Sequence, residues 1–124
     1  MNSSNENVFG APRHSNSRRR AIKDRVLVDL SSLEITRQHW RIQIACSSSV
    51  WAIVEDAVLQ HGKNIQGVLH DLYTLAKLNA KPNTIQDRIH FQATVGRKTC
   101  DFVLHVGPGD TPIPILTLVL PSDA

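Results

Sequence analysis

The run of residues 88–120 constrains the fold most, because apolar side chains recur there at every second position in three successive stretches. The first stretch carries them at Ile89, Phe91, Ala93 and Val95. The second carries them at Cys100, Phe102, Leu104 and Val106. Side chains of a strand point alternately to its two faces, so each stretch predicts a strand with one dry and one wet face. The run therefore predicts a three-stranded antiparallel meander.

Two turn sequences separate the three stretches. They are Gly96-Arg97-Lys98 and Gly107-Pro108-Gly109-Asp110. Glycine and proline in short connections are typical of hairpin loops. Pairing Val95 with Cys100 makes the two dry faces coincide, and a slip by one residue would expose one of them to water. The same register places His90 opposite His105 on the wet face.

The third stretch, residues 113–120, is apolar on both faces. Leu116, Leu118 and Leu120 share one face, whereas Ile115 and Val119 share the other. A strand that is apolar on both sides is typical of the centre of a sheet, or of a strand that meets a partner. If Ile115 and Val119 are uncovered in the monomer, their face favours a homodimer.

The segment before the meander predicts two amphipathic helices joined by a short loop. The serines at positions 47–49 offer an N-cap for a helix over residues 50–60, and Gly62 is placed to end that helix. Asn64 is a cap for a second helix, which stops before Pro82. This helical hairpin is expected to cover the dry face of the meander.

Shorter elements are expected nearer the N-terminus. The sequence predicts a helix over residues 17–24, a strand over 26–30, a helix begun by a Ser31–Glu34 capping box and a strand from Trp40 to Ile44. The predicted class is α+β, with a C-terminal three-stranded antiparallel meander packed against a two-helix hairpin. Residues 17–124 form the single expected domain, and residues 1–16, rich in Asn and Ser, are expected to be a disordered tail.

Positive charge is concentrated near the N-terminus. Residues 1–25 hold six basic and two acidic side chains and carry a net charge of +4, whereas the rest of the chain carries −1. We call residues 17–25 the basic arm, because they contain Arg18, Arg19, Arg20, Lys23 and Arg25. An arm without interleaved aromatic residues can contact nucleic-acid phosphates without reading sequence, contact an acidic protein surface, or act only as a solubilising tail.

Composition favours a cytoplasmic protein. The chain has 124 residues, of which 41% are hydrophobic, as expected for one globular domain. Two cysteines give no disulfide framework and favour a reducing compartment. No segment approaches the roughly 20 apolar residues of a membrane span, and the N-terminus lacks the apolar core of a signal peptide.

For each candidate catalytic or metal-binding residue, a structural role is a better explanation than a chemical one. His90 and His105 could share a divalent metal, but a zinc site needs three or four ligands, so a solvated cross-strand pair is favoured. The serines at 47–49 lack the context of a nucleophile, which leaves capping. Cys100 and His105 point to opposite faces of one strand and cannot meet. We therefore expect no enzyme activity, no cofactor and no resident metal.

Trp51 lies one position away from the apolar stripe of the first long helix. It is either a residue that lines a partner surface or a core residue at the helix start, and the second interpretation is favoured.

Three segments together resemble a known family. They are residues 21–31 (AIKDRVLVDLS), residues 49–52 (SVWA), and residues 106–110 (VGPGD) with the Leu118-Val119-Leu120-Pro121 strand end. They resemble a family of small bacterial proteins, a domain of unknown function, carried on plasmids and conjugative elements. The resemblance implies an accessory protein of mobile DNA. Such proteins bind and block a host defence complex, bind DNA, or regulate transfer.

The expected function is therefore non-enzymatic binding. The chain is expected to block a host protein or ribonucleoprotein complex, a defence assembly of the kind that anti-CRISPR or antirestriction proteins inhibit. The alternative is a nucleic-acid-binding accessory or regulatory protein that uses the basic arm. The candidate binding residues are Arg18, Arg19, Arg20, Lys23, Arg25, Trp51, Ile115 and Val119.

Overall fold

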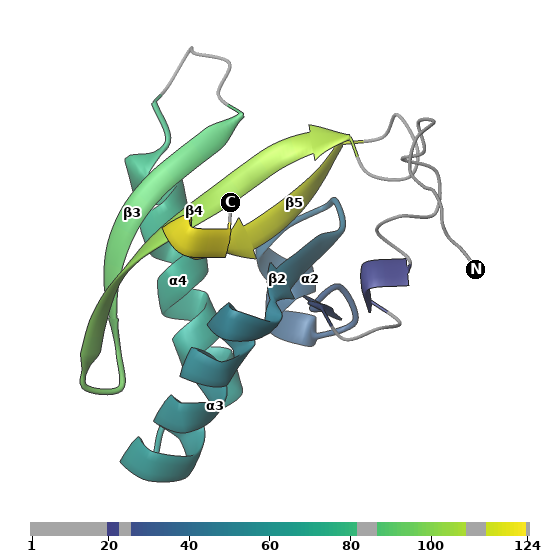
Figure 1. Ribbon diagram of the computed structural model, residues 1–124. Helices are drawn as coiled ribbons and strands as arrows, with labels where there is room; N and C mark the ends of the chain where they lie inside the picture. The colour runs from purple at the N-terminus through teal and green to yellow at the C-terminus, as the bar shows by residue number, and fades with distance from the viewer. Residues whose placement is uncertain (1–19, 23–25, 82–86, 109–113, 124) are drawn as a thin grey trace.

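The computed structural model describes residues 20–22, 26–81, 87–108 and 114–123. Its elements follow in the order β1 (Leu27–Asp29), α2 (Glu34–His39), β2 (Ile44–Ser47), α3 (Ser48–His61), α4 (Ile65–Asn79), β3 (Arg88–Val95), β4 (Lys98–Pro108), β5 (Pro114–Val119) and the 3₁₀ turn η1 (Pro121–Asp123). The strands form a five-stranded mixed sheet in the order β1-β2-β5-β4-β3, and helices α3 and α4 lie on one side of it (Figure 1). The class is α+β, as predicted.

The predicted meander is confirmed in part. Strands β3, β4 and β5 are neighbours and pair antiparallel in that order. They are three strands of a larger sheet, however, because β5 also pairs in parallel with β2, and β2 pairs antiparallel with β1. The strand that is apolar on both faces is thereby central, with β4 on one side and β2 on the other.

The register between β3 and β4 differs by two residues from the prediction. Val95 lies opposite Lys98, and Cys100 lies opposite Ala93. The turn contains only Gly96 and Arg97, and Gly96 has a φ of +65°. A shift of two positions leaves every side chain on the same face, so the dry faces still coincide.

The two long helices have the predicted caps. The Ser47 side chain accepts a hydrogen bond from the Val50 N–H at 3.2 Å, and the Asn64 side chain accepts one from the Gly67 N–H at 2.6 Å. Gly62 ends α3 in the left-handed conformation, with a φ of +66°. Helix α4 ends at Asn79, before Pro82. These bonds satisfy backbone donors at the helix starts, and this is why local sequence located both helices well.

Two expectations about the N-terminal elements are wrong. Ser31 does not cap α2, whose N-cap is Leu33 without a side-chain bond. Its hydroxyl instead accepts from the Ile44 N–H at 3.1 Å and donates to the Ile44 carbonyl at 3.2 Å. Strand β2 accordingly begins at Ile44, and Trp40 is the C-cap of α2. Of the helix expected over residues 17–24, residues 20–22 are helical and the others lie outside the described part.

The core lies between the sheet and the helical layer. Its largest fully buried side chains include Tyr73, Phe102, Leu30, Ile44, Leu69 and Leu72. Cys46 belongs to this core, and burial raises the pKa of its thiol to about 12. A thiol that stays protonated in apolar surroundings is a structural residue and a poor nucleophile.

The opposite face of the sheet also buries apolar side chains, at Ala45, Val103 and Val119. Val119 is only 7% exposed, and Ile115 is half-buried. A homodimer through this face was expected only if both residues were uncovered. That condition is therefore not met. In the described residues, no helix is long and apolar enough to cross a membrane.

The C-terminal turn is tied to the start of α3 through one carboxylate. Asp123 accepts hydrogen bonds from the Ser47 hydroxyl at 2.7 Å, the Leu120 N–H at 3.0 Å and the Ser49 hydroxyl at 3.1 Å. Burial alone would raise the pKa of Asp123, but these three bonds to the ionised form outweigh it and hold the pKa below its usual value.

Replacing Asp123 with asparagine should lower the free energy of unfolding by about 1 kcal/mol at pH 7, because charge-assisted bonds become neutral ones at an exposed position. A lowered folded-state pKa stabilises the fold above the usual aspartate value and loses that stabilisation as the pH falls below about 4. The difference between wild type and variant, measured by urea unfolding, should therefore shrink toward pH 3. The control is Asp71→Asn on α4, at an exposed position. A pH-independent difference, or an equal effect in the control, would contradict this account.

Candidate binding surfaces

The residues chosen from sequence do not form one surface. Arg18, Arg19, Lys23 and Arg25 lie outside the described residues, and Arg20 is exposed. Trp51 is half-buried and packs against the core on the helical side of the sheet. Ile115 alternates with the core residue Leu116 and so lies on the opposite side of the sheet.

The two wet-face histidines do not oppose each other. His90 lies opposite Val103, and Arg88 lies opposite His105, because the hairpin turn is shorter than expected. Burial lowers the pKa of His105, Arg88 and His90 lower it further, and Asp87 counteracts them. Over the described ranges, no group of three or more His, Cys, Asp or Glu side chains is placed to hold a metal ion.

Strand β3 forms a long sheet edge. It pairs with β4 along all eight residues, and no second strand in the described residues pairs with its other side. The Val106 N–H donates to the Asp87 carbonyl at 2.9 Å, so the odd-numbered residues of β3 direct their backbone N–H and C=O groups toward β4. In an antiparallel ladder the alternate residues then point their N–H and C=O groups outward. Those outward groups belong to Arg88, His90, Gln92 and Thr94.

Several of the usual protections of a sheet edge are missing from β3. Natural edges are commonly blunted by short strands, lysine, proline or a bulge. The sequence of β3 is RIHFQATV, without lysine or proline, and its register with β4 continues without a bulge. The opposite edge strand, β1, has only three residues. A shallow hollow adjoins β3 on the outer face, lined by His90, Gln92, Asp101 and Pro121 among others.

A second surface lies where α2 meets α4. The His39 Nε2 and His70 Nδ1 atoms are 2.9 Å apart, and the Lys77 Nζ atom lies 2.9 Å from His39 Nδ1. We call these three side chains the nitrogen cluster. His70 and Lys77 are exposed and His39 is half-buried, so the cluster is accessible from solvent.

Aromatic side chains support the nitrogen cluster from below. The Tyr73 and His39 ring centres are 5.3 Å apart, and the Lys77 Nζ atom lies 4.9 Å from the centre of the Trp40 ring. Tyr73 is fixed by a buried hydrogen bond of 2.7 Å between its hydroxyl and that of Thr36. Burial raises the pKa of Tyr73 to about 12, so its hydroxyl stays protonated. The buried Trp40 N–H has no hydrogen-bond acceptor among the described residues.

Charge in the nitrogen cluster is unbalanced. Burial lowers the pKa of His39, and the neighbouring Lys77 and His70 lower it further. No carboxylate of the described residues forms an ion pair or hydrogen bond with the three side chains. His39 is therefore held in its neutral form beside a lysine, which leaves a local excess of donors for an acceptor from outside.

Sequence reasoning missed this cluster. His70, Tyr73 and Lys77 stand three and four positions apart on α4, a spacing that places side chains on one helix face. This spacing was a usable signal. The contribution of α2 was not predictable, because His39 is more than 30 positions away in the chain from its partners.

Comparisons with known proteins give no relative. No protein-family model, no curated protein and no solved structure matches this chain.

Proposed function

We propose that this chain is a non-enzymatic accessory protein of mobile DNA that binds and blocks a host protein or ribonucleoprotein complex. The observation that carries the proposal is the eight-residue edge of β3, which turns a row of backbone donors and acceptors outward. The resemblance to plasmid-borne proteins supplies the setting, a bacterial defence assembly of the type blocked by anti-CRISPR or antirestriction proteins.

The proposed occupant of the edge is an extended segment of the host protein. Such a segment adds one strand to the sheet by bonding the outward N–H and C=O groups of His90, Gln92 and Thr94. Backbone bonds supply affinity, and side-chain contacts supply specificity. Arg88 at the start of the edge favours an acidic side chain on the added strand, and the hollow beside His90 and Gln92 can receive a second side chain.

A proline on the edge tests this mode of binding. Gln92→Pro removes one outward N–H while leaving the ladder with β4 intact, because Gln92 bonds on the free side. Gln92→Thr is the matched control, since it removes the same side chain and keeps the N–H. Wild type and the threonine variant should capture the same host factor and protect incoming DNA in cells with an active restriction or CRISPR system. The proline variant should bind at least about tenfold more weakly.

Hydrogen exchange provides the direct readout. In the complex, the outward amides of Gln92 and Thr94 should exchange more slowly than in the free protein. Equal binding by the proline and threonine variants would remove the edge from the mechanism. A purified chain that binds no host factor and leaves defence activity unchanged would refute the proposed function as a whole.

The alternative function, nucleic-acid binding through the basic arm, is favoured by one described feature, the exposed Arg20 beside the fold. It requires binding that weakens steeply with salt and is lost when Arg18, Arg19 and Arg20 become alanine. A gel shift that never appears at low salt would exclude it.

A further inference from the structure

The nitrogen cluster has a defined pattern of hydrogens. Protonated Lys77 can only donate, so His39 Nδ1 is the acceptor in the 2.9 Å contact. His39 then carries its proton on Nε2 and donates to His70 Nδ1, also at 2.9 Å. His70 in turn carries its proton on Nε2. The result is a chain of hydrogen bonds that starts at the ammonium group of Lys77 and contains no anion.

From this arrangement we infer that the nitrogen cluster is a binding site for a phosphate group, held between Lys77 Nζ and the His39 imidazole. The site is independent of the β3 edge and of the blocking function proposed above. Its position at the surface fits a phosphate group presented from outside the fold, as in contacts that position a nucleic-acid backbone. The two sources of such a group are a nucleic-acid strand and a free phosphate compound.

Binding exchanges one hydrogen bond for two. When a phosphate oxygen approaches, His39 takes a proton from solvent at Nδ1, and its bond from Lys77 is broken. The new Nδ1–H and an N–H of Lys77 then both point at the anion, and both bonds are charge-assisted. His39 Nε2–H keeps its bond to His70. One proton is therefore taken up for each phosphate bound.

The groups that face His39 keep its imidazole neutral until an anion binds. Lys77 and His70 from α4 raise the cost of a positive charge on His39, as does its partial burial, and an adjacent anion offsets that cost. Tyr73, the other titratable group in contact with the His39 ring, stays protonated and neutral. Two further charged residues, Glu34 and Arg37, lie on α2, the helix that carries His39.

A metal ion fits the cluster less well than an anion. A metal on His39 Nε2 would move the imidazole proton to Nδ1, where it would face the ammonium of Lys77. Only two imidazoles meet here, and the described residues supply no third His, Cys, Asp or Glu to the group. A transition metal would therefore require both the loss of Lys77 and ligands from elsewhere.

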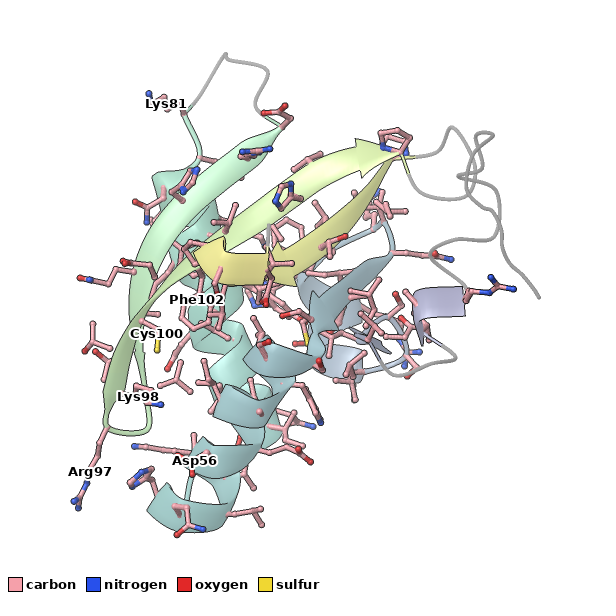
Figure 2. The ribbon with its side chains drawn as sticks, viewed as in Figure 1. Asp56, Lys81, Arg97, Lys98, Cys100 and Phe102 are labelled. Carbon is pink, nitrogen blue, oxygen red and sulfur yellow. The ribbon has the colours of Figure 1, made fainter. Side chains whose placement is uncertain are left out.

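The first experiment uses the full chain and inorganic phosphate. The imidazole resonances of His39 and His70 are followed by NMR as phosphate replaces chloride at constant ionic strength. Both resonances should shift in parallel and level off as the phosphate concentration rises. Lys77→Met, which keeps the aliphatic stem, should weaken the response about tenfold, because it removes one charge-assisted bond. Lys98→Met, at an exposed position next to the β3–β4 turn (Figure 2), should leave it unchanged.

The second experiment uses a short oligothymidylate without terminal phosphates, whose charge is constant between pH 6 and pH 8. If the phosphate belongs to nucleic acid, its affinity should rise from pH 8 to pH 6 in wild type. His39→Gln should reduce this rise because glutamine takes up no proton. If phosphate shifts the imidazoles but Lys77→Met leaves oligothymidylate affinity unchanged, the ligand is a free phosphate compound.

Three outcomes would overturn the site. They are no imidazole response to phosphate at low salt, equal responses in Lys77→Met and Lys98→Met, and a response to Zn²⁺ without one to phosphate. None of them depends on whether a host factor binds the β3 edge, so this site and the proposed function fail separately.

Discussion

Replacing Phe102 with alanine should lower the free energy of unfolding by about 3–5 kcal/mol. Phe102 is 1% exposed and lies on β4, between the neighbouring strands β3 and β5. Its ring stacks on that of Phe91, with 5.5 Å between ring centres. Truncation removes the apolar contacts of the ring and leaves a cavity that sheet and helices cannot close without losing other contacts.

Urea unfolding at pH 7 measures this loss. Leu78→Ala on α4 is the control, because Leu78 is 74% exposed and its truncation should change stability by no more than about 0.5 kcal/mol. A cost below about 1 kcal/mol at Phe102 would mean that the ring is not enclosed as described. Because β4 supports the whole length of β3, the variant should also expose the amides of β3 to faster hydrogen exchange.

Local sequence was sufficient where one segment determines its own structure. The caps at Ser47, Gly62 and Asn64 were predictable because each bond or backbone conformation lies within a few residues of the helix end. Alternation located β3 and β4 for the same reason. The apolar pattern on both faces of residues 113–120 predicted either a central strand or a strand that meets a partner, and β5 is central in the sheet.

The errors arise where distant segments compete. Ser31 had the spacing of a capping box, but the backbone of Ile44 engages its hydroxyl instead, so α2 begins without that cap. The parallel pairing of β2 with β5 joins segments separated by both long helices and two strands. Turn length was ambiguous because registers that differ by two residues bury the same face of each strand.

Among the candidate sites, too, local features were predictable and contacts between distant segments were not. The basic arm was evident from composition, although all its basic residues except Arg20 lie outside the described part of the chain. Val119 was a candidate binding residue because of the apolar pattern of its strand, but it is buried in the sheet. The nitrogen cluster forms only when α2 packs against α4, so the spacing of residues on α4 could not reveal the contribution of His39.

Replacing Gly96 with alanine should destabilise the fold by about 2–4 kcal/mol, more than the same change at Gly62. Gly96 has a φ of +65° and Gly62 a φ of +66°, so both variants incur the strain of a left-handed conformation, about 1–2 kcal/mol. A Cβ at Gly62 would have no atom within 4 Å. At Gly96 it would lie 2.7 Å from His61 Cδ2 and 3.3 Å from Ala57 Cβ, so the imidazole and the hairpin tip would have to move, at a further cost of about 1–2 kcal/mol.

The difference between the two variants isolates this contact, because the backbone strain is common to both. It is measured by urea unfolding of Gly62→Ala and Gly96→Ala side by side, and the double variant Gly96→Ala/His61→Ala should recover the part due to the imidazole. Equal losses at the two glycines would mean that the hairpin tip does not rest on α3. If the tip does rest there, α3 helps to hold the free edge of β3 straight, and Gly96→Ala should weaken binding of an added strand even at temperatures where the variant remains folded.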